Sequence, residues 1–241
     1  MRPFLSIIIP AYNEETRLPA TLEQIFTFLQ SQPYNSEVLV IENGSRDRTL
    51  QVAQAYAQTQ PTLKVIHNPE RGKGLAVRRG MLEARGEYRF MCDADLSMPA
   101  GEINRFFPPL LENASIAIAS REVPGAVRYN EPAYRHFIGR GYNLLIRWLA
   151  LPNLQDTQCG FKCFRGEAAE QLFVKQTLTG WSFDVEILFI ACRLGHKIVE
   201  VPIPWYYNAE SKINVFKDSL RMGMDLLKIR INDWRGVYHI G

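Results

Sequence analysis

The sequence predicts an α/β protein with a mostly parallel central sheet flanked by helices. In the first half of the chain, short apolar runs alternate with segments that have helical spacing, and this alternation is typical of a parallel sheet that is covered on both faces. Polar, acidic and glycine-containing loops follow the apolar runs. Because ligands bind at the carboxyl ends of the strands in such sheets, the loops predict a binding site at one edge.

The elements of this sheet can be located in order along the chain. The short apolar runs predict buried strands at residues 5–10, 38–41, 63–66, 88–92 and 116–119. The longer segments between them predict helices at residues 18–30, 49–58, 73–83 and 102–111. The second half is expected to add helices at residues 137–149, 183–194 and 215–231 and a hairpin-like closure. No internal repeat or linker interrupts this order, which predicts a single domain.

Composition excludes several classes of protein. The 241 residues are 46% hydrophobic and 22% charged, with a net charge of +3. This composition is that of an ordinary globular chain, and the charge is too small to predict a nucleic-acid-binding face. The four cysteines form no C-x-x-C motif, which favours reduced thiols over a zinc site. No signal-peptide pattern or membrane-spanning run is present, so we expect a cytoplasmic protein.

Two carboxylates, Asp93 and Asp95, follow the apolar run at residues 88–92. A hard divalent cation such as Mg²⁺ or Mn²⁺ takes one or two protein carboxylates and completes its coordination with phosphate oxygens and water. An isolated Asp-x-Asp pair is more often simply solvated. Its position at the end of a predicted strand, beside other polar loops, favours a site for a metal bound to a diphosphate.

Three common phosphate-binding folds are disfavoured. Gly72 and Gly74 do not complete G-x-G-x-x-G, because Val77 stands at the third glycine position. The same segment lacks the earlier glycine and the following Ser or Thr of a P-loop, since His67 and Gly74 occupy those positions. A sugar nucleotidyltransferase usually has a glycine-rich loop after the first strand, and residues 11–15 contain no glycine.

Several motifs occur in the order found in family 2 inverting glycosyltransferases. They are Pro10-Ala11-Tyr12-Asn13-Glu14-Glu15, Glu42-Asn43-Gly44-Ser45, Gly72-Lys73-Gly74, Asp93-Ala94-Asp95, Ser120-Arg121, Asp156-Thr157-Gln158-Cys159-Gly160-Phe161-Lys162, Trp181-x-Phe183-Asp184-x-Glu186 and Ser211-Lys212. The chain resembles this family over nearly its whole length, and its later motifs are most similar to those of dolichyl-phosphate β-glucosyltransferases, with dolichyl-phosphate mannosyltransferases as near relatives. The resemblance implies a GT-A type nucleotide-sugar-binding fold, in which residues 1–122 form the nucleotide-binding half and residues 123–241 the acceptor-binding and closing half.

The resemblance implies roles for residues of the first two loops. Pro10, Tyr12 and Glu14 are expected to form the floor and edge of the nucleoside pocket, and Glu42 to accept a hydrogen bond from the base. The family more often has two aspartates where this chain has Glu42 and Asn43, so both uracil and guanine remain open. The alternative for Tyr12 is a loop aromatic that closes the core, and for Glu14 an acid that matches the dipole of the following helix.

The resemblance assigns metal and ribose contacts to Asp93, Ala94 and Asp95, with Asp95 as the direct ligand of Mg²⁺ or Mn²⁺. Ser97 stands where mannosyl relatives can have a glutamine, and it is assigned to the metal either directly or through water.

Two lysines are assigned to the nucleotide. Lys73 begins a predicted helix, where a cation opposes the helix dipole unless an anion lies nearby. A phosphate, or a loop carboxylate such as Glu42, would supply that anion, and simple surface exposure is the alternative. The resemblance implies that Lys212 lies on a closing loop.

Arginines of the second half are assigned to phosphate groups. The resemblance implies that Arg121 faces the donor diphosphate and that Arg135 and Arg140 receive an acceptor phosphate. Relatives often have serine at the position of Gly139, which removes one phosphate donor here. The planar donor fork of arginine suits this task.

The residues expected to take part in catalysis are Asp95, Asp156, Arg121 and Arg135. A lipid phosphate is already largely ionised at pH 7, since its second pKa is near 6, and it needs no strong general base. Asp156 is therefore expected to position the sugar or the acceptor. If the acceptor were a hydroxyl group, Asp156, Asp184 or Glu186 would have to act as the base; the last two also suit the start of a helix for structural reasons alone.

Contact with a membrane is expected from surface helices. In the segment at residues 215–231, apolar side chains recur at helical spacing at Phe216, Leu220, Met224, Leu227 and Ile231, and basic residues lie off this stripe. Such a helix can lie on anionic lipid, or its stripe can pack against the sheet. Residues 137–149 form a second amphipathic candidate. The expected attachment is peripheral.

The function that follows is inverting, metal-dependent transfer of one hexose to a polyprenyl (dolichyl-type) phosphate at the cytosolic membrane face, with glucose from UDP-glucose as the expected donor. The alternatives are mannose from GDP-mannose, a hydroxyl acceptor, and a nucleotide-sugar-binding module without turnover.

Overall fold

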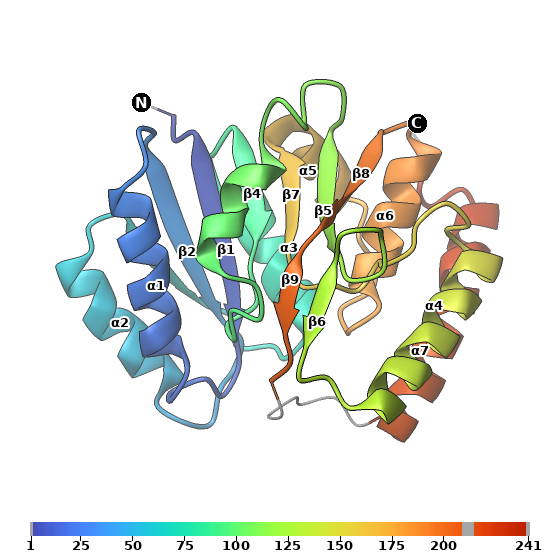
Figure 1. The fold of residues 1–241 in the computed structure, drawn as a ribbon, viewed down its shortest axis with the longest axis horizontal. Helices are drawn as coiled ribbons and strands as arrows, with labels where there is room; N and C mark the ends of the chain where they lie inside the picture. Colours follow the sequence, from blue (N-terminus) through green and yellow to red (C-terminus); the bar gives the residue numbers. More distant parts are fainter. Residues whose placement is uncertain (1, 209–214, 240–241) are drawn as a thin grey trace.

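The computed structural model describes residues 2–208 and 215–239, which fold around a seven-stranded sheet (Figure 1). In spatial order the strands are β3, β2, β1, β4, β7, β5 and β8. Their bounds are β1 Leu5–Ala11, β2 Ser36–Glu42, β3 Leu63–His67, β4 Tyr88–Met91, β5 Ile116–Ser120, β7 Lys162–Arg165 and β8 Ile198–Pro202. The strands β6 Val127–Tyr129 and β9 Pro204–Tyr206 pair beside it as a small parallel sheet.

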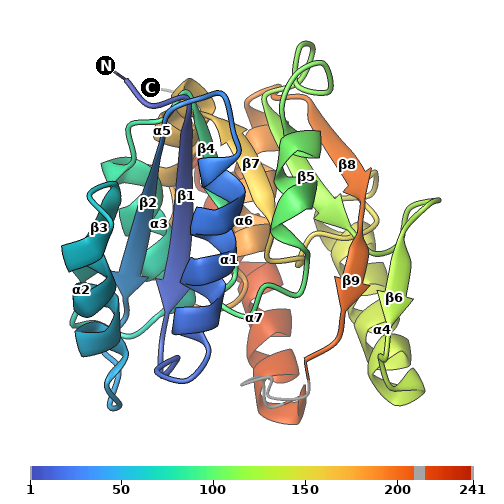
Figure 2. The same ribbon diagram turned by 60° about the vertical axis from the view of Figure 1, so that its left-hand side comes forward.

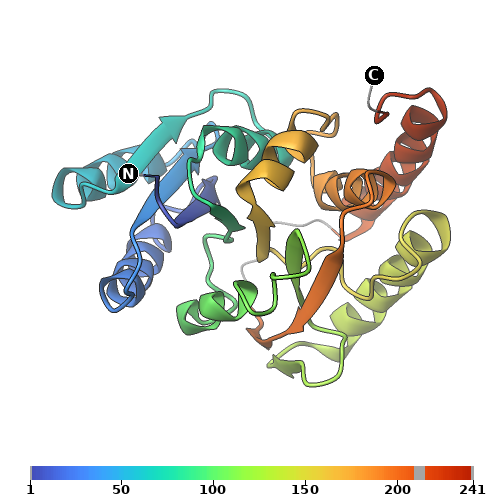
Figure 3. The same ribbon diagram turned by 90° about the horizontal axis from the view of Figure 1, so that it is seen from above.

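Helices cover both faces of the sheet (Figures 2 and 3). The helices are α1 Leu18–Gln30, α2 Thr49–Thr59, α3 Lys73–Glu83, α4 Ala133–Leu149, α5 Gly166–Phe173, α6 Phe183–Arg193 and α7 Val215–Trp234, and the 3₁₀-helix η1 spans Ala100–Phe106. The helices α1, α2 and η1 pack on one face, and α3, α5 and α6 pack on the other.

The mostly parallel sheet predicted from the sequence is confirmed, and all five predicted strands are present. The exception is β7, which runs antiparallel between β4 and β5. Neither β7 nor β8 was located from the sequence. Because β7 lies between strands of the first half, it brings the second half of the chain into the centre of the sheet.

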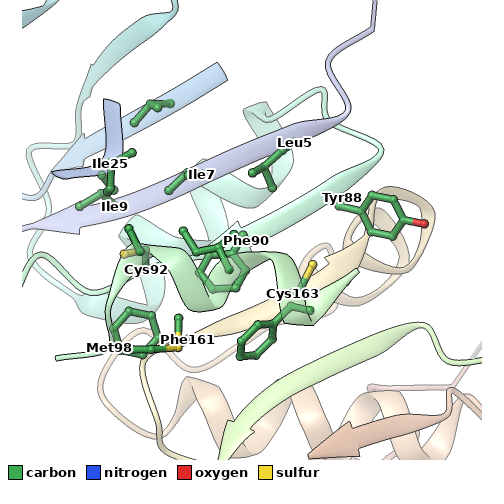
Figure 4. Packing of buried hydrophobic residues seen from close by; sticks show 14 of the residues in the cluster. Leu5, Ile7, Ile9, Ile25, Tyr88, Phe90, Cys92, Met98, Phe161 and Cys163 are labelled. Atoms are coloured by element: carbon green, nitrogen blue, oxygen red, sulfur yellow. The ribbon is translucent and has the colours of Figure 1, made fainter. Parts of the chain in front are cut away.

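Successive side chains of the buried strands point to opposite faces of the sheet, which divides the core into two layers. On β1, Ile7 and Ile9 pack under α1 and η1, whereas Ile8 packs on the opposite face under α3. Figure 4 shows the first layer, in which Phe90 of β4 lies near Ile7 and Phe161. All of these side chains are buried, which explains why the strands appear in the sequence as continuous apolar runs.

The predicted helix at residues 102–111 is wrong. The structure has the short 3₁₀-helix η1 there, and Phe107 is extended, with φ −109° and ψ 179°. Pro108 and Pro109 follow. A residue before proline disfavours the helical conformation, and proline has no N–H for a helical hydrogen bond.

The predicted hairpin-like closure is also wrong for the described residues. The closing strands β6 and β9 run parallel and come from distant parts of the chain. The rings of Tyr129 and Tyr206 stack between them, with centroids 4.6 Å apart.

The helices α4 and α7 lie side by side next to α6 (Figures 1 and 3). The helix α7 packs inward through Leu226 and Ile229. Met224, Leu227 and Ile231 of the predicted stripe are 57%, 55% and 46% exposed, so the described part of the stripe faces solvent. Among the described residues, no helix has both the length and the apolar character needed to cross a bilayer.

The contact between α3 and the sheet gives a stability prediction. A Cβ atom at Gly80 would lie 2.3 Å from Ile8 Cγ2 and 3.0 Å from Ile41 Cγ1. Gly80→Ala should therefore lower the free energy of unfolding by about 1–3 kcal/mol, although alanine favours a helix by about 1 kcal/mol over glycine. Thermal unfolding followed by circular dichroism measures this change.

The matched control is Gly139→Ala in α4, where an added Cβ meets no atom within 4 Å. This variant should be as stable as the unmodified protein or slightly more stable. Equal stability of the two variants would show that the contact of α3 with the sheet is looser than described.

Candidate active site

The loops after β1, β2 and β3 are tied to one another at the carboxyl edge of the sheet. Ser45 Oγ accepts a hydrogen bond from the Asn13 backbone amide at 3.0 Å. The side-chain oxygen of Asn43 accepts one from the Gly72 amide at 3.2 Å. Asn13 has a φ of 53°, a left-handed conformation that asparagine tolerates better than most residues. These contacts hold the three loops predicted to bind nucleotide in one arrangement.

In the first loop, the ring of Tyr12 is stacked against Arg71, whose guanidinium carbon lies 4.3 Å from the ring centroid. The Glu14 side chain instead binds Arg17, with N–O distances of 2.7 and 2.9 Å. Pro10 is partly buried within β1. Of the three residues predicted for the nucleoside pocket, Tyr12 therefore has a planar cation against its ring, and Glu14 stabilises the start of α1.

Glu42, at the end of β2, is enclosed by the chain, and its side chain is only 1% exposed. Its carboxylate accepts a hydrogen bond from the Ser45 amide, and its other oxygen lies 2.5 Å from His67 Nδ1. The His67 side chain is 51% exposed. At the position where the sequence predicts a base contact, the imidazole therefore forms the outer surface and the carboxylate lies behind it.

Lys73 and Asp93 form an ion pair, with Nζ 2.7 Å from Oδ1. Lys73 begins α3, and Asp93 follows β4. Burial lowers the pKa of Lys73, but the charges of Asp93, Asp184 and Asp95 outweigh burial and raise that pKa above its ordinary value. A cation at a helix N-terminus opposes the helix dipole unless an anion lies nearby. That anion is Asp93, and neither Glu42 nor surface exposure accounts for Lys73.

The Asp93 side chain leaves no room for a Cβ atom at Gly160, in the segment that leads into β7. An atom there would lie 1.8 Å from Asp93 Oδ2 and 2.2 Å from Cγ, where the closest real contacts are about 3 Å. On the other side, Thr21 Oγ1 of α1 donates a hydrogen bond to the Ala94 carbonyl at 2.6 Å. The loop after β4 is thus confined from both halves of the chain.

The backbone turn after Asp95 directs the Ser97 amide toward the Asp95 carboxylate. Leu96 has a φ of 42°, which is uncommon for a residue with a Cβ atom, and the Ser97 amide then donates to Asp95 Oδ1 at 3.2 Å. Burial and the charge of Asp93 raise the pKa of Asp95, whereas hydrogen bonds from Ser97 act in the opposite direction. Ser97 thus lies against Asp95 as a hydrogen-bond donor.

A second ion pair lies deeper in the site. Lys162 Nζ of β7 is 2.7 Å from Asp184 Oδ1 at the start of α6, and the two side chains are 3% and 5% exposed. Burial raises the pKa of Asp184, and the charges of Lys162 and Lys73 oppose this shift. Lys73 Nζ also lies 5.2 Å from the centroid of the Trp181 ring. Lys73 is therefore the cation that links Asp93 to the buried pair.

Arg121 and Asp156 form a third pair with two-point geometry. The distances are 2.7 Å from Nε to Oδ2 and 2.9 Å from Nη2 to Oδ1, and the Arg121 amide donates to the same carboxylate at 3.0 Å. Asp156 is completely buried. Burial raises its pKa, but Arg121 outweighs burial and lowers the pKa to about 2. Asp156 is therefore anionic, and Arg121 binds both of its carboxylate oxygens.

The other arginines of the second half are not all gathered at this edge. Arg128 pairs with Glu122 and Glu131, and its guanidinium, like that of Arg121, lies against the Trp205 ring. Arg140 is exposed on α4. The side chain of Arg135 and the whole of Lys212 lie outside the described part of the chain.

Two carboxylates that are two residues apart form the acidic part of the site. No group of three or more His, Cys, Asp or Glu side chains among residues 2–208 and 215–239 could hold a metal ion. Asp93 and Asp95 could contribute two carboxylates, and burial together with the charge of Asp93 raises the pKa of Asp95. This donor set fits a hard divalent cation that receives its remaining ligands from phosphate and water.

Some residues of the site had no role in the sequence prediction. Lys162 occupies a strand with the sequence Lys-Cys-Phe-Arg, and a lysine flanked by buried residues is uncommon unless it is paired. Lys162 also ends the family motif at residues 156–162, in which it was given no role of its own. Thr21 and Glu200 carried no such signal, because their partners are distant in the chain. Glu200 accepts a hydrogen bond from the Asp156 backbone amide at 3.0 Å.

The chain has relatives among known proteins. Residues 6–173 match the family described as Glycosyl transferase family 2. A dolichyl-phosphate beta-glucosyltransferase of Dictyostelium discoideum is 34% identical over 98% of this chain and 77% of its own length, and the protein of that name from Mus musculus is 35% identical over 98% and 78%.

A similar fold occurs in the glucosyl-3-phosphoglycerate synthase of Mycobacterium tuberculosis, crystallised with Mn²⁺ and UDP-glucose. The TM-score is 0.65 with 17% identity, over 95% of this chain and 78% of that one. This likeness confirms the predicted GT-A type fold. With the match of the family to most of the chain and relatives above 30% identity over nearly all of it, this protein belongs to glycosyltransferase family 2.

Proposed function

We propose that this protein transfers glucose from UDP-glucose, with inversion, to a dolichyl-type polyprenyl phosphate at the cytosolic membrane face. Similarity over 98% of this chain, and over 77% and 78% of two proteins named dolichyl-phosphate beta-glucosyltransferase, supports the sugar and the acceptor. The observation that carries the proposal is that three buried acidic side chains are already bound by other groups of the protein. Asp156, Asp184 and Glu186 are each held by a protein partner, which favours an acceptor that needs no general base.

The donor would bind across the loops at the carboxyl edge of the sheet. Tyr12, with the Arg71 guanidinium against its ring, offers a flat surface for a base, and Lys73 offers a cation for the diphosphate. The exposed imidazole of His67 lies over Glu42, so we propose that Glu42 acts on the base together with His67. Pro10, Glu14, Ala94 and Lys212 complete the proposed nucleotide-binding set.

A divalent cation, Mg²⁺ or Mn²⁺, would be held by Asp95 and Asp93, with Ser97 fixing the Asp95 carboxylate. When bound, such an ion neutralises charge on the leaving diphosphate. Lys73 would hold Asp93 in place through Oδ1, while Oδ2 packs against Gly160. Two carboxylates in a poorly solvated site repel each other, and a cation there offsets that repulsion.

Repulsion between two phosphate groups is the main difficulty of the reaction, because both must meet at one carbon atom. Arg121 is proposed to counter it, and its orientation is fixed by the two-point contact with Asp156. Fixed charges in a site that excludes water act more strongly than the same charges in water. Arg135 and Arg140, at the start and middle of α4, are proposed to receive the acceptor phosphate.

The outer faces of α4 and α7 are proposed to rest on the membrane. Trp148 of α4 and Trp234 of α7 are 82% and 87% exposed, and Met224 and Leu227 add exposed apolar surface. Basic side chains are exposed on the same two helices, namely Arg140, Arg147, Arg221, Lys228 and Arg230. Apolar side chains with flanking cations suit the surface of a bilayer that contains anionic lipid.

A transfer assay tests the function directly. Purified protein is incubated with labelled UDP-glucose or GDP-mannose and with a short polyprenyl phosphate or the corresponding polyprenol, each with and without Mn²⁺. We expect labelled lipid only from UDP-glucose with the phosphate, and only with metal. Transfer from GDP-mannose would change the sugar assignment, transfer to the polyprenol would require a base, and nucleotide binding without product would indicate a module without turnover.

Asp95→Asn tests the metal role. The amide keeps the shape of the side chain but removes its charge, so transfer should fall by roughly 100-fold or more, the size of effect seen when one electrostatic contact to a transition state is lost. Binding of Mn²⁺ in the presence of UDP, followed by calorimetry, should weaken in parallel. The matched control is Glu23→Gln, an exposed carboxylate on α1, and full transfer by Asp95→Asn would refute the assignment.

The membrane face is tested by replacing two tryptophans. Trp148→Ala with Trp234→Ala should weaken binding to vesicles that contain anionic lipid by at least roughly tenfold, as measured by co-sedimentation. Both side chains are exposed, so thermal stability should not change. The control pair is Leu82→Ala with Leu110→Ala, whose side chains are also exposed but lie on other elements. Equal loss in both double variants would mean that α4 and α7 are not the contact surface.

A further inference from the structure

The segment between α5 and α6 lies against the N-terminus of α3. The Thr179 carbonyl accepts a hydrogen bond from the Gly74 amide at 2.9 Å, and Gln176 Nε2 donates to the Gly74 carbonyl at 2.9 Å. A Cβ atom at Gly72 would lie 2.5 Å from the Thr179 carbonyl oxygen. Residues 176–179, called here the supporting loop, therefore touch the chain directly on both sides of Lys73.

The supporting loop is itself held by Glu186 of α6, which is completely buried. The Glu186 carboxylate accepts hydrogen bonds from the Thr177 amide at 3.0 Å and the Leu178 amide at 2.7 Å, and the Thr177 hydroxyl also donates to it. A carboxylate that receives several hydrogen bonds in a buried position is fixed in orientation. Glu186 therefore does not serve as a base; it holds the loop that contacts Lys73.

The remaining contacts of this group come from the C-terminal part of the chain. The Tyr238 hydroxyl, just beyond α7, donates to Glu186 Oε1 at 2.8 Å. Asn232 of α7 donates to the Thr177 hydroxyl at 3.1 Å. A second connection joins Ser182 Oγ to Asp225 Oδ2 of α7 at 2.7 Å, one residue after Trp181, whose ring faces Lys73.

We propose that Glu186 and Tyr238 are positioning residues for the donor site, which hold the supporting loop so that Lys73 stays directed at Asp93. Helix α7 and the residues after it thereby determine how tightly the nucleotide diphosphate is bound. The inference rests on the proposed donor role of Lys73. It assigns a task to Glu186 that differs from both alternatives open at the sequence level, a base and a helix N-terminal acid.

Tyr238→Phe tests this inference with the loss of one hydroxyl group. The ring remains to fill its buried position, and Glu186 loses its contact with the C-terminal segment. We expect the Kd of UDP with Mn²⁺ to rise roughly two- to tenfold, the range for loss of one buried hydrogen bond, and the KM for the donor to rise while the KM for polyprenyl phosphate stays unchanged. Amide hydrogen exchange in the first turn of α3 should become faster without nucleotide.

A double-mutant cycle separates positioning from general destabilisation. In a Lys73→Met background, Tyr238→Phe should have no further effect on the Kd of UDP, because its effect passes through the Lys73 side chain. The matched control is Tyr56→Phe, which removes a tyrosine hydroxyl that donates to the Pro19 carbonyl on the opposite face of the sheet. Ser182→Ala is the second test variant, because it removes the other connection to α7.

The outcomes are distinct. An unmodified protein that binds neither UDP nor GDP would refute the donor site itself. A protein that binds UDP, but whose Tyr238→Phe and Ser182→Ala variants bind it equally well, would refute the positioning role and leave the donor site intact. Effects of Tyr238→Phe that add in full to those of Lys73→Met, or that Tyr56→Phe reproduces, would also refute it.

Discussion

The placement of Asp93 between Lys73 and Gly160 is the constraint on which the candidate site depends. Lys73 supplies the opposite charge at 2.7 Å, and the missing side chain at Gly160 supplies the space. A lysine at a helix N-terminus is unfavourable by itself, and a carboxylate near a second carboxylate is unfavourable by itself. Their contact removes part of both penalties and fixes three distant segments of the chain at one point.

The ion pair of Lys162 and Asp184 is more deeply buried than the contact between Lys73 and Asp93. Asp93 and Lys73 keep some exposure, whereas Lys162 and Asp184 are almost completely enclosed. Breaking a buried pair by removing one partner is costly, because an uncompensated charge remains. The deep pairs therefore hold a rigid arrangement of charges beneath the partly exposed carboxylates, and charges fixed in this way are effective at stabilising charge that develops in a reaction.

Local patterns in the sequence predicted the local structure well. The helices α1 and α3 have the predicted bounds, because apolar spacing along a helix depends on neighbouring residues only. The predictions that failed depended on distant residues or on proline. The strand β7 pairs antiparallel with β4 and β5, and no pattern within its four residues reveals its partners.

The distinction between local patterns and contacts of distant residues also applies to the candidate site. The order of the loops predicted which segments would meet, since parallel strands end at one edge. It did not predict that Lys73 would bind Asp93 instead of Glu42, because side-chain pairing depends on the depth and direction of each loop. The exposed stripe of α7 could not be distinguished in sequence from a buried stripe, because both have the same spacing.

The insertion of β7 between β4 and β5 also matters while the chain is being synthesised. Both neighbours of β5 in the sheet, β7 and β8, come later in the chain than β5 itself. A nascent chain that has just emerged beyond Ser120 therefore carries β5 without a partner and β4 with one unpaired side. Unpaired strand edges promote association between chains, so release of an incomplete polypeptide from the ribosome would favour aggregation, and chaperones that cover such edges would have most effect before β7 and β8 emerge.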